Sequence, residues 1–211
     1  MDTSAFWTII EAARSAGGPD RPFGEALVDE LAALTKDGIL RYQERFDEVH
    51  DAVYRWDVWA AAYLIGGGCS DDSFMDFRAG LIALGRDWYE RAAACPDSLA
   101  EHPAVIAAAD VYRDEALFYE EVNYAASEAF ERIAGDGEDF YEAWDAYRAS
   151  QGSAEEDSDS EDMGEDFDFD DPDEMRRRLP RLSALYLRET SSPCTASAGD
   201  RGGEGWGQPP H

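Results

Sequence analysis

Apolar side chains recur at every third or fourth position through most of residues 1–150, and this spacing constrains the fold more than any other feature of the chain. The pattern is clearest between Ile39 and Tyr63. A period near 3.6 residues places such side chains along one face of an α-helix. The alternation typical of half-buried strands is nearly absent. The sequence therefore predicts an all-α bundle of about six or seven helices.

Glycine and proline mark where these helices should end. Gly17, Gly18 and Pro19 close the first, and the run from Gly66 to Gly68 interrupts the pattern again, because glycine has a low helix propensity. Thr3 or Ser4 is a suitable cap for the first helix. The expected helices span residues 4–15, 22–34, 37–65, 70–95, 111–133 and 139–148. Short helical turns are expected across residues 97–109.

Composition divides the chain into four parts. Residues 1–150 form the bundle, and residues 151–171 form an acidic flexible linker, since 13 acids and no base lie between Glu155 and Glu174. Apolar periodicity returns in residues 172–187, which predict a C-terminal helix that packs on the bundle, capped by Asp171 and kinked or broken at Pro180. Residues 188–211 are rich in Gly, Ser and Pro and predict a disordered tail.

The charge balance bears on possible partners. The chain has 47 acidic and 18 basic residues, for a net charge of -29. Such a surface repels nucleic-acid phosphates and anionic lipid headgroups, so neither nucleic acid nor a membrane is an expected partner. A basic protein is the partner that the charge suggests. The sequence does not indicate an oligomeric state.

The cysteine pattern and the N-terminus favour a cytoplasmic protein. Cys69, Cys95 and Cys194 are widely spaced and odd in number, which suggests neither a zinc site nor a disulfide framework. The N-terminal segment lacks the basic region of a signal peptide, and the apolar run at residues 58–65 is too short to cross a bilayer. No motif predicts a cofactor.

Three segments resemble a known family. MDTSAFWTIIEAAR at the N-terminus, YRWDVWAAAYLIGGGCSDDSFMDFRAGLIALGRDWYE in the centre and FDFDDPDEMRRRLPRLSALYL near the end are similar to the bacterial domain-of-unknown-function family 4240. The resemblance covers most of residues 1–187. It implies a small cytoplasmic bacterial protein whose last helix belongs to the domain. It implies no activity and no catalytic residues.

His50, Asp57 and Arg78 form the most interesting candidate polar site. If residues 37–65 and 70–95 are antiparallel helices folded back at the glycine run, Asp57 and Arg78 lie at similar heights, because each residue adds about 1.5 Å. An Asp57–Arg78 ion pair at the core edge is therefore expected. Together with His50 it could hold a carboxylate or a phosphate. The favoured interpretation is a buried pair that fixes the register of the two helices.

The helix turn formed by Cys69, Ser70, Asp71 and Asp72 is the second candidate. Glycines before a helix N-terminus are typical of anion-binding loops, but the two carboxylates would repel a phosphate and attract a cation or a basic partner instead. Cys69 could be reactive at a helix start, although a structural thiol is the favoured interpretation. Ser70 is a good helix cap.

Two further groups of charged residues stand out in the sequence. The basic cluster contains Arg176, Arg177, Arg178 and Arg181, and the acidic run before it could fold back and mask these side chains. Glu115, Glu121 and Glu128 lack the Glu-x-x-His pair of di-iron bundles, so no metal site is predicted. No nucleophile motif is present, and no catalytic residue is predicted.

These observations favour an interaction or regulatory module over an enzyme. One alternative is a small-ligand-binding protein or enzyme with a polar pocket between the helices expected at residues 37–65 and 70–95. A weaker alternative is a DNA mimic, because the chain is strongly acidic.

Overall fold

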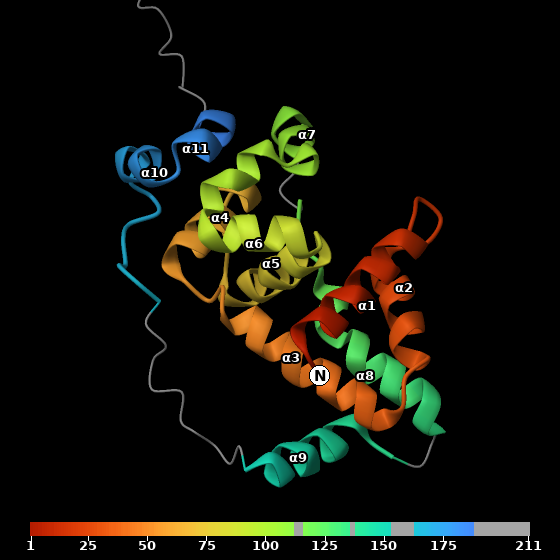
Figure 1. Cartoon of the computed structure of the whole chain (residues 1–211). Helices are drawn as coiled ribbons and strands as arrows, with labels where there is room; N and C mark the ends of the chain where they lie inside the picture. Colours follow the sequence, from red (N-terminus) through yellow and green to blue (C-terminus); the bar gives the residue numbers. More distant parts are fainter. Residues whose placement is uncertain (112–115, 136–137, 153–162, 188–211) are drawn as a thin grey trace, which may run out of the picture.

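The fold is all-α. The structure, a computed structural model, describes residues 1–111, 116–135, 138–152 and 163–187 (Figure 1). Within these residues the chain forms eleven α-helices, one 3₁₀ helix and no β-strand, which confirms the predicted fold class. The tail predicted at 188–211 and half of the linker predicted at 151–171 lie outside the described residues.

The helix boundaries are as follows. The first seven elements are α1 (Thr3–Ala16), α2 (Phe23–Ala32), α3 (Lys36–Asp51), α4 (Trp56–Gly66), α5 (Asp71–Ala83), α6 (Arg86–Ala94) and the 3₁₀ helix η1 (Pro96–Glu101). The others are α7 (Pro103–Val111), α8 (Glu120–Ala134), α9 (Phe140–Gln151), α10 (Pro172–Arg178) and α11 (Pro180–Tyr186). No helix in the described ranges is long and apolar enough to span a membrane.

The helices outnumber the prediction because long expected helices are divided. The helix expected at residues 37–65 ends at Asp51 and restarts at Trp56, with Val53 fully buried between them. The helix expected at residues 70–95 breaks at Gly85, whose φ is 86°, a left-handed value that favours glycine. In the segment expected as one helix at 111–133, residues 116–119 are not helical and α8 begins at Glu120. Burial of side chains at these breaks overrides local helix propensity.

Helix ends and caps that depend on neighbouring residues were predicted more accurately. Gly67 and Gly68 have φ values of 64° and 135° at the end of α4, and Ser70 accepts a hydrogen bond from the backbone N–H of Ser73. Asp171 caps α10, and the helix is broken at Leu179, just before Pro180. The cap of α1 was wrong, since Asp2 rather than Thr3 or Ser4 accepts from the Ala5 N–H, at 2.8 Å.

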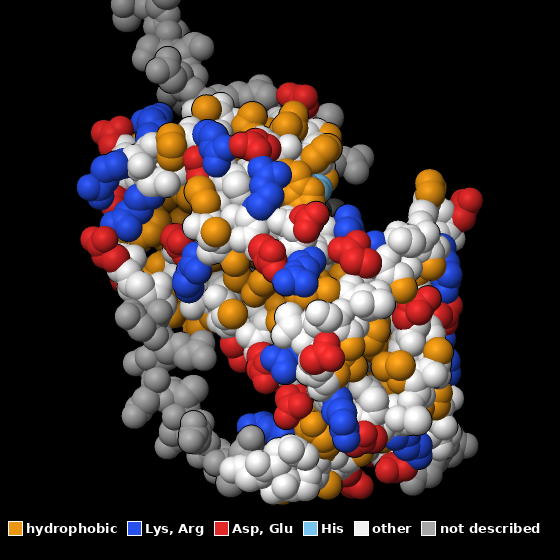
Figure 2. Space-filling view, viewed as in Figure 1, with side chains coloured by type: hydrophobic (Ala, Val, Ile, Leu, Met, Phe, Trp, Pro, Cys, Tyr) orange, Lys and Arg blue, Asp and Glu red, His pale blue; other side chains and the backbone are white. Residues whose placement is uncertain are grey.

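The helices form two groups. We call α1, α2, α3 and α8 the first lobe, and α4, α6, η1, α7 and α11 the second lobe; α5 contacts both lobes (Figure 1). The space-filling view shows a hollow between the lobes on the side of α1 and α6 (Figure 2). Hollows between packed units are common places for ligands.

The described part of the expected linker, residues 163–171, lies against α4. The Trp56 N–H donates to the Met163 carbonyl at 3.0 Å, and the Phe169 ring lies 6.0 Å from the Trp56 ring and 5.5 Å from the Tyr63 ring. Aromatic contacts of this kind hold an otherwise acidic segment on the second lobe.

Candidate functional sites

His50 and Arg78 come together as the sequence suggested, but Asp57 does not join them. Arg78 is 6% exposed, and its Nη1 donates to the His50 carbonyl at 3.2 Å and to the Asp51 carboxylate at 3.4 Å. The His50 Nε2 donates to the Met75 carbonyl at 3.1 Å. Arg78 therefore satisfies a carbonyl at the C-terminal end of α3, where helix carbonyls lack partners in their own helix.

The expected Asp57–Arg78 ion pair is wrong. Asp57 lies in the first turn of α4 and forms two hydrogen bonds with Arg55, at 2.9 and 3.0 Å. The physical reason is the break between α3 and α4, which changes the helical register after Asp51. As a result, the carboxylate beside Arg78 belongs to the last residue of α3.

The Arg78 guanidinium fills the space between two helices. It lies 4.7 Å from the centre of the Tyr54 ring and 5.2 Å from that of the Phe74 ring. Neither of the two cavities described below is lined by His50, Asp57 or Arg78. This geometry favours the structural interpretation of the cluster, in which buried contacts join α3 to α5.

The corrected pairing gives a test at Asp57. Asp57→Ala is expected to lower the free energy of unfolding by less than about 1 kcal/mol, because the Asp57 and Arg55 side chains are 44% and 33% exposed and water screens the pair. Urea denaturation followed by circular dichroism measures the change. Arg78→Met is the buried comparison and is expected to cost more. A loss of several kcal/mol in Asp57→Ala would contradict the pairing.

Asp47 lies beside this cluster and is a strongly perturbed acid. Burial raises its pKa to about 6, opposed by a hydrogen bond from the Gln43 Nε2 at 2.7 Å. The pKa of the neighbouring Asp51 carboxyl is instead lowered, first by the His50 imidazole, whose Nδ1 lies 3.7 Å from the carboxylate. The two carboxyls therefore have opposite effects on stability as pH changes.

We expect Asp47→Asn to stabilise the protein at pH 7 by about 1–2 kcal/mol. Because the folded state holds the Asp47 proton up to about pH 6 and the unfolded state releases it near pH 4, ionisation costs stability as pH rises through that window. The advantage of the variant should vanish at pH 4. Asp51→Asn is the control, since it should destabilise at pH 7. Urea denaturation at several pH values measures both, and an equal advantage at pH 4 and pH 7 would exclude this account.

Cys69 has the properties of a structural thiol. Burial raises its pKa to about 12, and the nearby Asp76 and Asp71 carboxylates act in the same direction. The Trp59 Nε1 donates to the Cys69 carbonyl at 3.1 Å, which holds this turn against α4. A thiol with a raised pKa forms little thiolate at neutral pH. Cys194 lies outside the described residues.

The turn carries part of a larger group of carboxylates. We define the acidic patch as Asp71, Asp72 and Asp76 of α5 with Glu120 and Glu121 of α8. The start of α8 is held on α5 by the Tyr119 N–H, which donates to the Asp76 carbonyl at 3.2 Å, and by the Asn123 Nδ2, which donates to the Asp76 carboxylate at 3.0 Å. Burial raises the pKa of Asp76, and the charges of Glu120, Asp72 and Glu121 raise it further.

The acidic patch does not have metal-site geometry. Among the described residues, no group of three or more His, Cys, Asp or Glu side chains is arranged to hold a metal ion. Glu115, considered above as a carboxylate of a possible metal site, lies outside the described residues. The patch is therefore a concentration of negative charge that a flexible basic side chain can approach.

The arginines of the basic cluster are all engaged by carboxylates. Arg176 pairs with Asp173 at 3.1 Å, and Arg177 pairs with Glu174. Arg178 pairs with Glu174 at 2.6 Å and with Glu165 at 3.0 Å, and its guanidinium lies 4.2 Å from the centre of the Phe167 ring. Arg181 pairs with Asp97 and Glu101. These ion pairs neutralise the positive charges of the cluster with carboxylates of the same chain.

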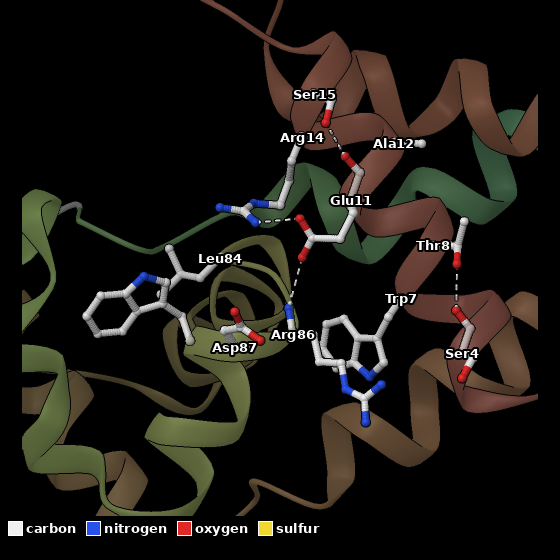
Figure 3. Close-up of a pocket in the computed structure, with 11 residues that line it drawn as sticks. Ser4, Trp7, Thr8, Glu11, Ala12, Arg14, Ser15, Leu84, Arg86 and Asp87 are labelled. Carbon is white, nitrogen blue, oxygen red and sulfur yellow. Dashed lines mark hydrogen bonds and ion pairs between the residues drawn. The ribbon is translucent and has the colours of Figure 1, made fainter.

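Sequence reasoning missed Glu11, which joins α1 to α6. Its carboxylate accepts from the Arg86 N–H at 3.1 Å and from the Arg14 Nη1 at 2.7 Å (Figure 3). Gly85 precedes α6 and has no side chain to cap it, so Glu11 provides the cap from another helix. The signal in the sequence was a helix start without a capping residue.

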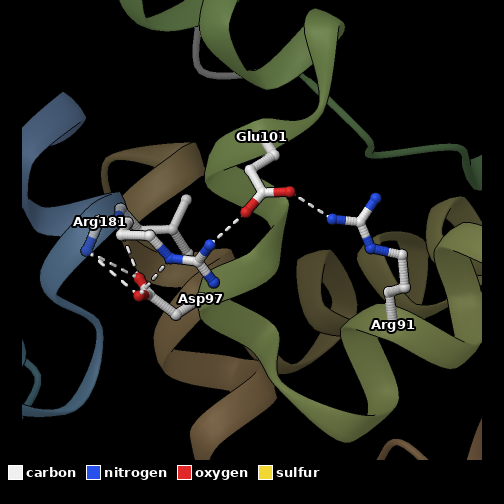
Figure 4. A network of polar contacts seen from close by, with 5 residues as sticks. Arg91, Asp97, Glu101 and Arg181 are labelled. Atoms are coloured by element: carbon white, nitrogen blue, oxygen red, sulfur yellow. Dashed lines mark hydrogen bonds and ion pairs between the residues drawn. The ribbon is translucent and has the colours of Figure 1, made fainter.

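Asp97 was missed in the same way. It is 6% exposed and accepts from the backbone N–H groups of Arg181, at 3.0 Å, and Leu182, at 2.9 Å, while the Arg181 Nε donates at 3.0 Å (Figure 4). Glu101 bridges Arg181 and Arg91 beside it. Leu179 precedes α11 and offers no cap, so Asp97 both caps this helix and holds it on the second lobe.

Comparisons with known proteins give one match. The family model described as "Protein of unknown function (DUF4240)" matches residues 1–132. The curated proteins and the solved structures gave no match. The matched residues run from α1 into α8 and include more than half of the chain. The resemblance seen in the sequence is thus confirmed, and the chain belongs to the DUF4240 family.

Proposed function

We propose that the chain is a protein-interaction module that binds a basic partner through the acidic patch. The observation that carries this proposal is that, among the described residues, no Lys or Arg forms an ion pair with a carboxylate of the patch. In the described part of the chain, every Lys and Arg side chain apart from Arg148 forms an ion pair with a carboxylate. None of those pairs involves a residue of the patch.

Charge crowding in the patch supports attraction of a cationic partner. After burial, the charges of Glu120, Asp72 and Glu121 raise the pKa of Asp76, so positive charge brought to the patch relieves repulsion among these carboxylates. Complementary charge of this kind raises association rates, and its effect falls as salt is added.

Exposed apolar side chains adjoin the same surface. Tyr124 is 46% exposed and follows Glu120 by four residues on α8, which places both on one helix face. Met75 is 43% exposed and precedes Asp76 on α5. Aromatic residues and methionine are enriched in protein interfaces, where they supply contact area beside polar groups.

Peptide-display selection tests the proposal. Selection on the wild-type protein is expected to enrich peptides that contain Lys or Arg together with an apolar residue. Their affinity, measured by fluorescence anisotropy, should fall at least about tenfold in a variant that combines Asp72→Asn, Asp76→Asn, Glu120→Gln and Glu121→Gln.

A variant with the same net charge controls for long-range electrostatics. It combines Glu128→Gln, Glu131→Gln, Glu142→Gln and Asp145→Asn, four exposed acids of α8 and α9. This control is expected to retain most of the affinity. Enriched peptides without basic residues, or equal losses in both variants, would exclude the patch as the binding surface.

A further inference from the structure

Two adjoining cavities open between the lobes, and of the residues that line them only Glu121 belongs to the acidic patch. The larger, of about 930 Å³, is lined by residues that include Trp7, Glu11, Arg86 and Trp88. The smaller, of about 550 Å³, is lined in part by Arg21, Phe23, His102 and Tyr119. Arg14 and Leu84 line both, so the two cavities adjoin between α1 and the α5–α6 junction, and together we call them the groove. Volumes in this range suit small molecules.

Arg14 stands at the centre of the groove. Its guanidinium crosses from α1 to the start of α6, where a Cβ on Gly85 would collide with the Arg14 Nη1. The glycine therefore leaves the space that this side chain occupies. In the close-up, the Arg14 side chain extends from α1 beside Leu84 and Glu11 (Figure 3). The Arg14 charge also helps to lower the pKa of His102, after burial, which places the two side chains near each other.

The hydrogen-bond donor of the neutral His102 ring is its Nε2 atom. Its Nδ1 accepts from the backbone N–H of Ala104 at 3.2 Å, which assigns the proton of the neutral ring to Nε2. Tyr119, whose hydroxyl group is a further donor, also lines the smaller cavity. Two arginines, a histidine and a tyrosine thus line the same small space.

The charged residues that line the smaller cavity are mostly basic, whereas those of the whole chain are mostly acidic. The lining of this cavity contains Arg14 and Arg21 but one carboxylate, Glu121, whereas the whole chain has 47 acidic and 18 basic residues. Arg14 is ion-paired with Glu11, which lines the larger cavity, and Arg21 is ion-paired with Asp29, which lines neither. Arginine donors beside an imidazole N–H are suited to oxyanions, since guanidinium groups bind them through two parallel hydrogen bonds.

The remaining lining is apolar. Phe23 begins α2, Ala83 ends α5, and Leu84 follows directly. An occupant therefore meets cationic donors on one part of its surface and hydrocarbon on the other, the combination found in sites for small organic anions.

We propose that this cavity binds a small organic anion, with its oxyanion group held by Arg14, Arg21 and His102 and its apolar part against Phe23 and Leu84. The site shares Glu121 with the acidic patch, and it lies between α1 and α5–α6 rather than at Arg78, where the sequence had suggested a pocket.

Phenyl phosphate and benzoate are suitable probes, because both join an oxyanion to an apolar ring. Isothermal titration calorimetry of the full chain should show saturable binding of at least one probe, tighter than inorganic phosphate or acetate. The stronger probe identifies the class of oxyanion. All titrations use KCl to keep ionic strength equal, since added salt alone screens a protein of charge -29.

Three variants locate the site. Arg14→Gln and Arg21→Gln are each expected to weaken probe binding by about tenfold or more, because each loses a charge-assisted hydrogen bond. Arg41→Gln removes an exposed charge on α3, paired with Asp37, and should bind as the wild type does. Circular dichroism confirms that each variant is folded. Failure of both probes to bind the wild type, or equal weakening in Arg41→Gln, would overturn the proposal.

Discussion

Gly80→Ala is expected to destabilise the protein by about 3 kcal/mol or more. A Cβ at Gly80 would overlap the carbonyl oxygen of Leu117 and lie 2.7 Å from its carbonyl carbon. Alanine is favoured over glycine inside a helix by about 1 kcal/mol, so steric overlap has to outweigh this gain. The steric overlap outweighs the gain because the overlapping carbonyl belongs to the backbone of the segment 116–119. This segment is held in place by the hydrogen bond from the Tyr119 N–H to the Asp76 carbonyl. Urea denaturation followed by circular dichroism measures the loss.

Gly24→Ala is the matched control for Gly80→Ala. Both glycines are helical, and both have a close neighbour where a Cβ would stand. At Gly24, however, the neighbour is the Cγ of the exposed Glu121 side chain, which can rotate away. The control is expected to change stability by less than about 1 kcal/mol. Equal stability of the two variants would show that α5 does not cross the 116–119 segment as closely as described.

The sequence predicted those features that depend on a few neighbouring residues. The stop at Gly66–Gly68, the Ser70 and Asp171 caps and the break at Pro180 follow from backbone freedom, short polar side chains and the missing proline N–H. Each is a local preference that tertiary contacts leave in place.

The features that were missed depend on contacts distant in sequence. The break between α3 and α4 follows no glycine or proline; Val53 is buried there, and Arg78 binds the end of α3 from α5. This break moved the partner of Arg78 from Asp57 to Asp51. The helix starts at Gly85 and Leu179 lack local caps, and only the folded chain shows that Glu11 and Asp97 supply them.

The groove between the lobes was missed for the same reason. Arg14, Arg21 and His102 come from α1, the following loop and the junction between η1 and α7, and no spacing rule joins them. The sequence did identify an acidic helix turn at Asp71 and Asp72. It gave no sign that α8 adds Glu120 and Glu121, because that contact depends on how α8 packs on α5.

Asp97→Ala is expected to lower the free energy of unfolding by about 2–4 kcal/mol and to release α11 from the second lobe. Pro180 has no N–H, so the first N–H groups of α11 that need a partner are those of Arg181 and Leu182, and both donate to Asp97. Loss of a helix cap costs about 1 kcal/mol. The Arg181 Nε loses the same partner, although this side chain is 45% exposed and water offsets part of that loss.

Limited trypsin digestion separates release of α11 from general unfolding. In Asp97→Ala, cleavage after Arg176, Arg177, Arg178 and Arg181 should accelerate before the helices of the first lobe are cut. Asp173→Ala is the control, because it removes an aspartate that pairs with Arg176 but is 93% exposed. It should alter neither stability nor the order of cleavage by much. If Asp97→Ala is cleaved at the same rate as the wild type, α11 is held by its apolar face, Leu182 above all, and Asp97 does not anchor it.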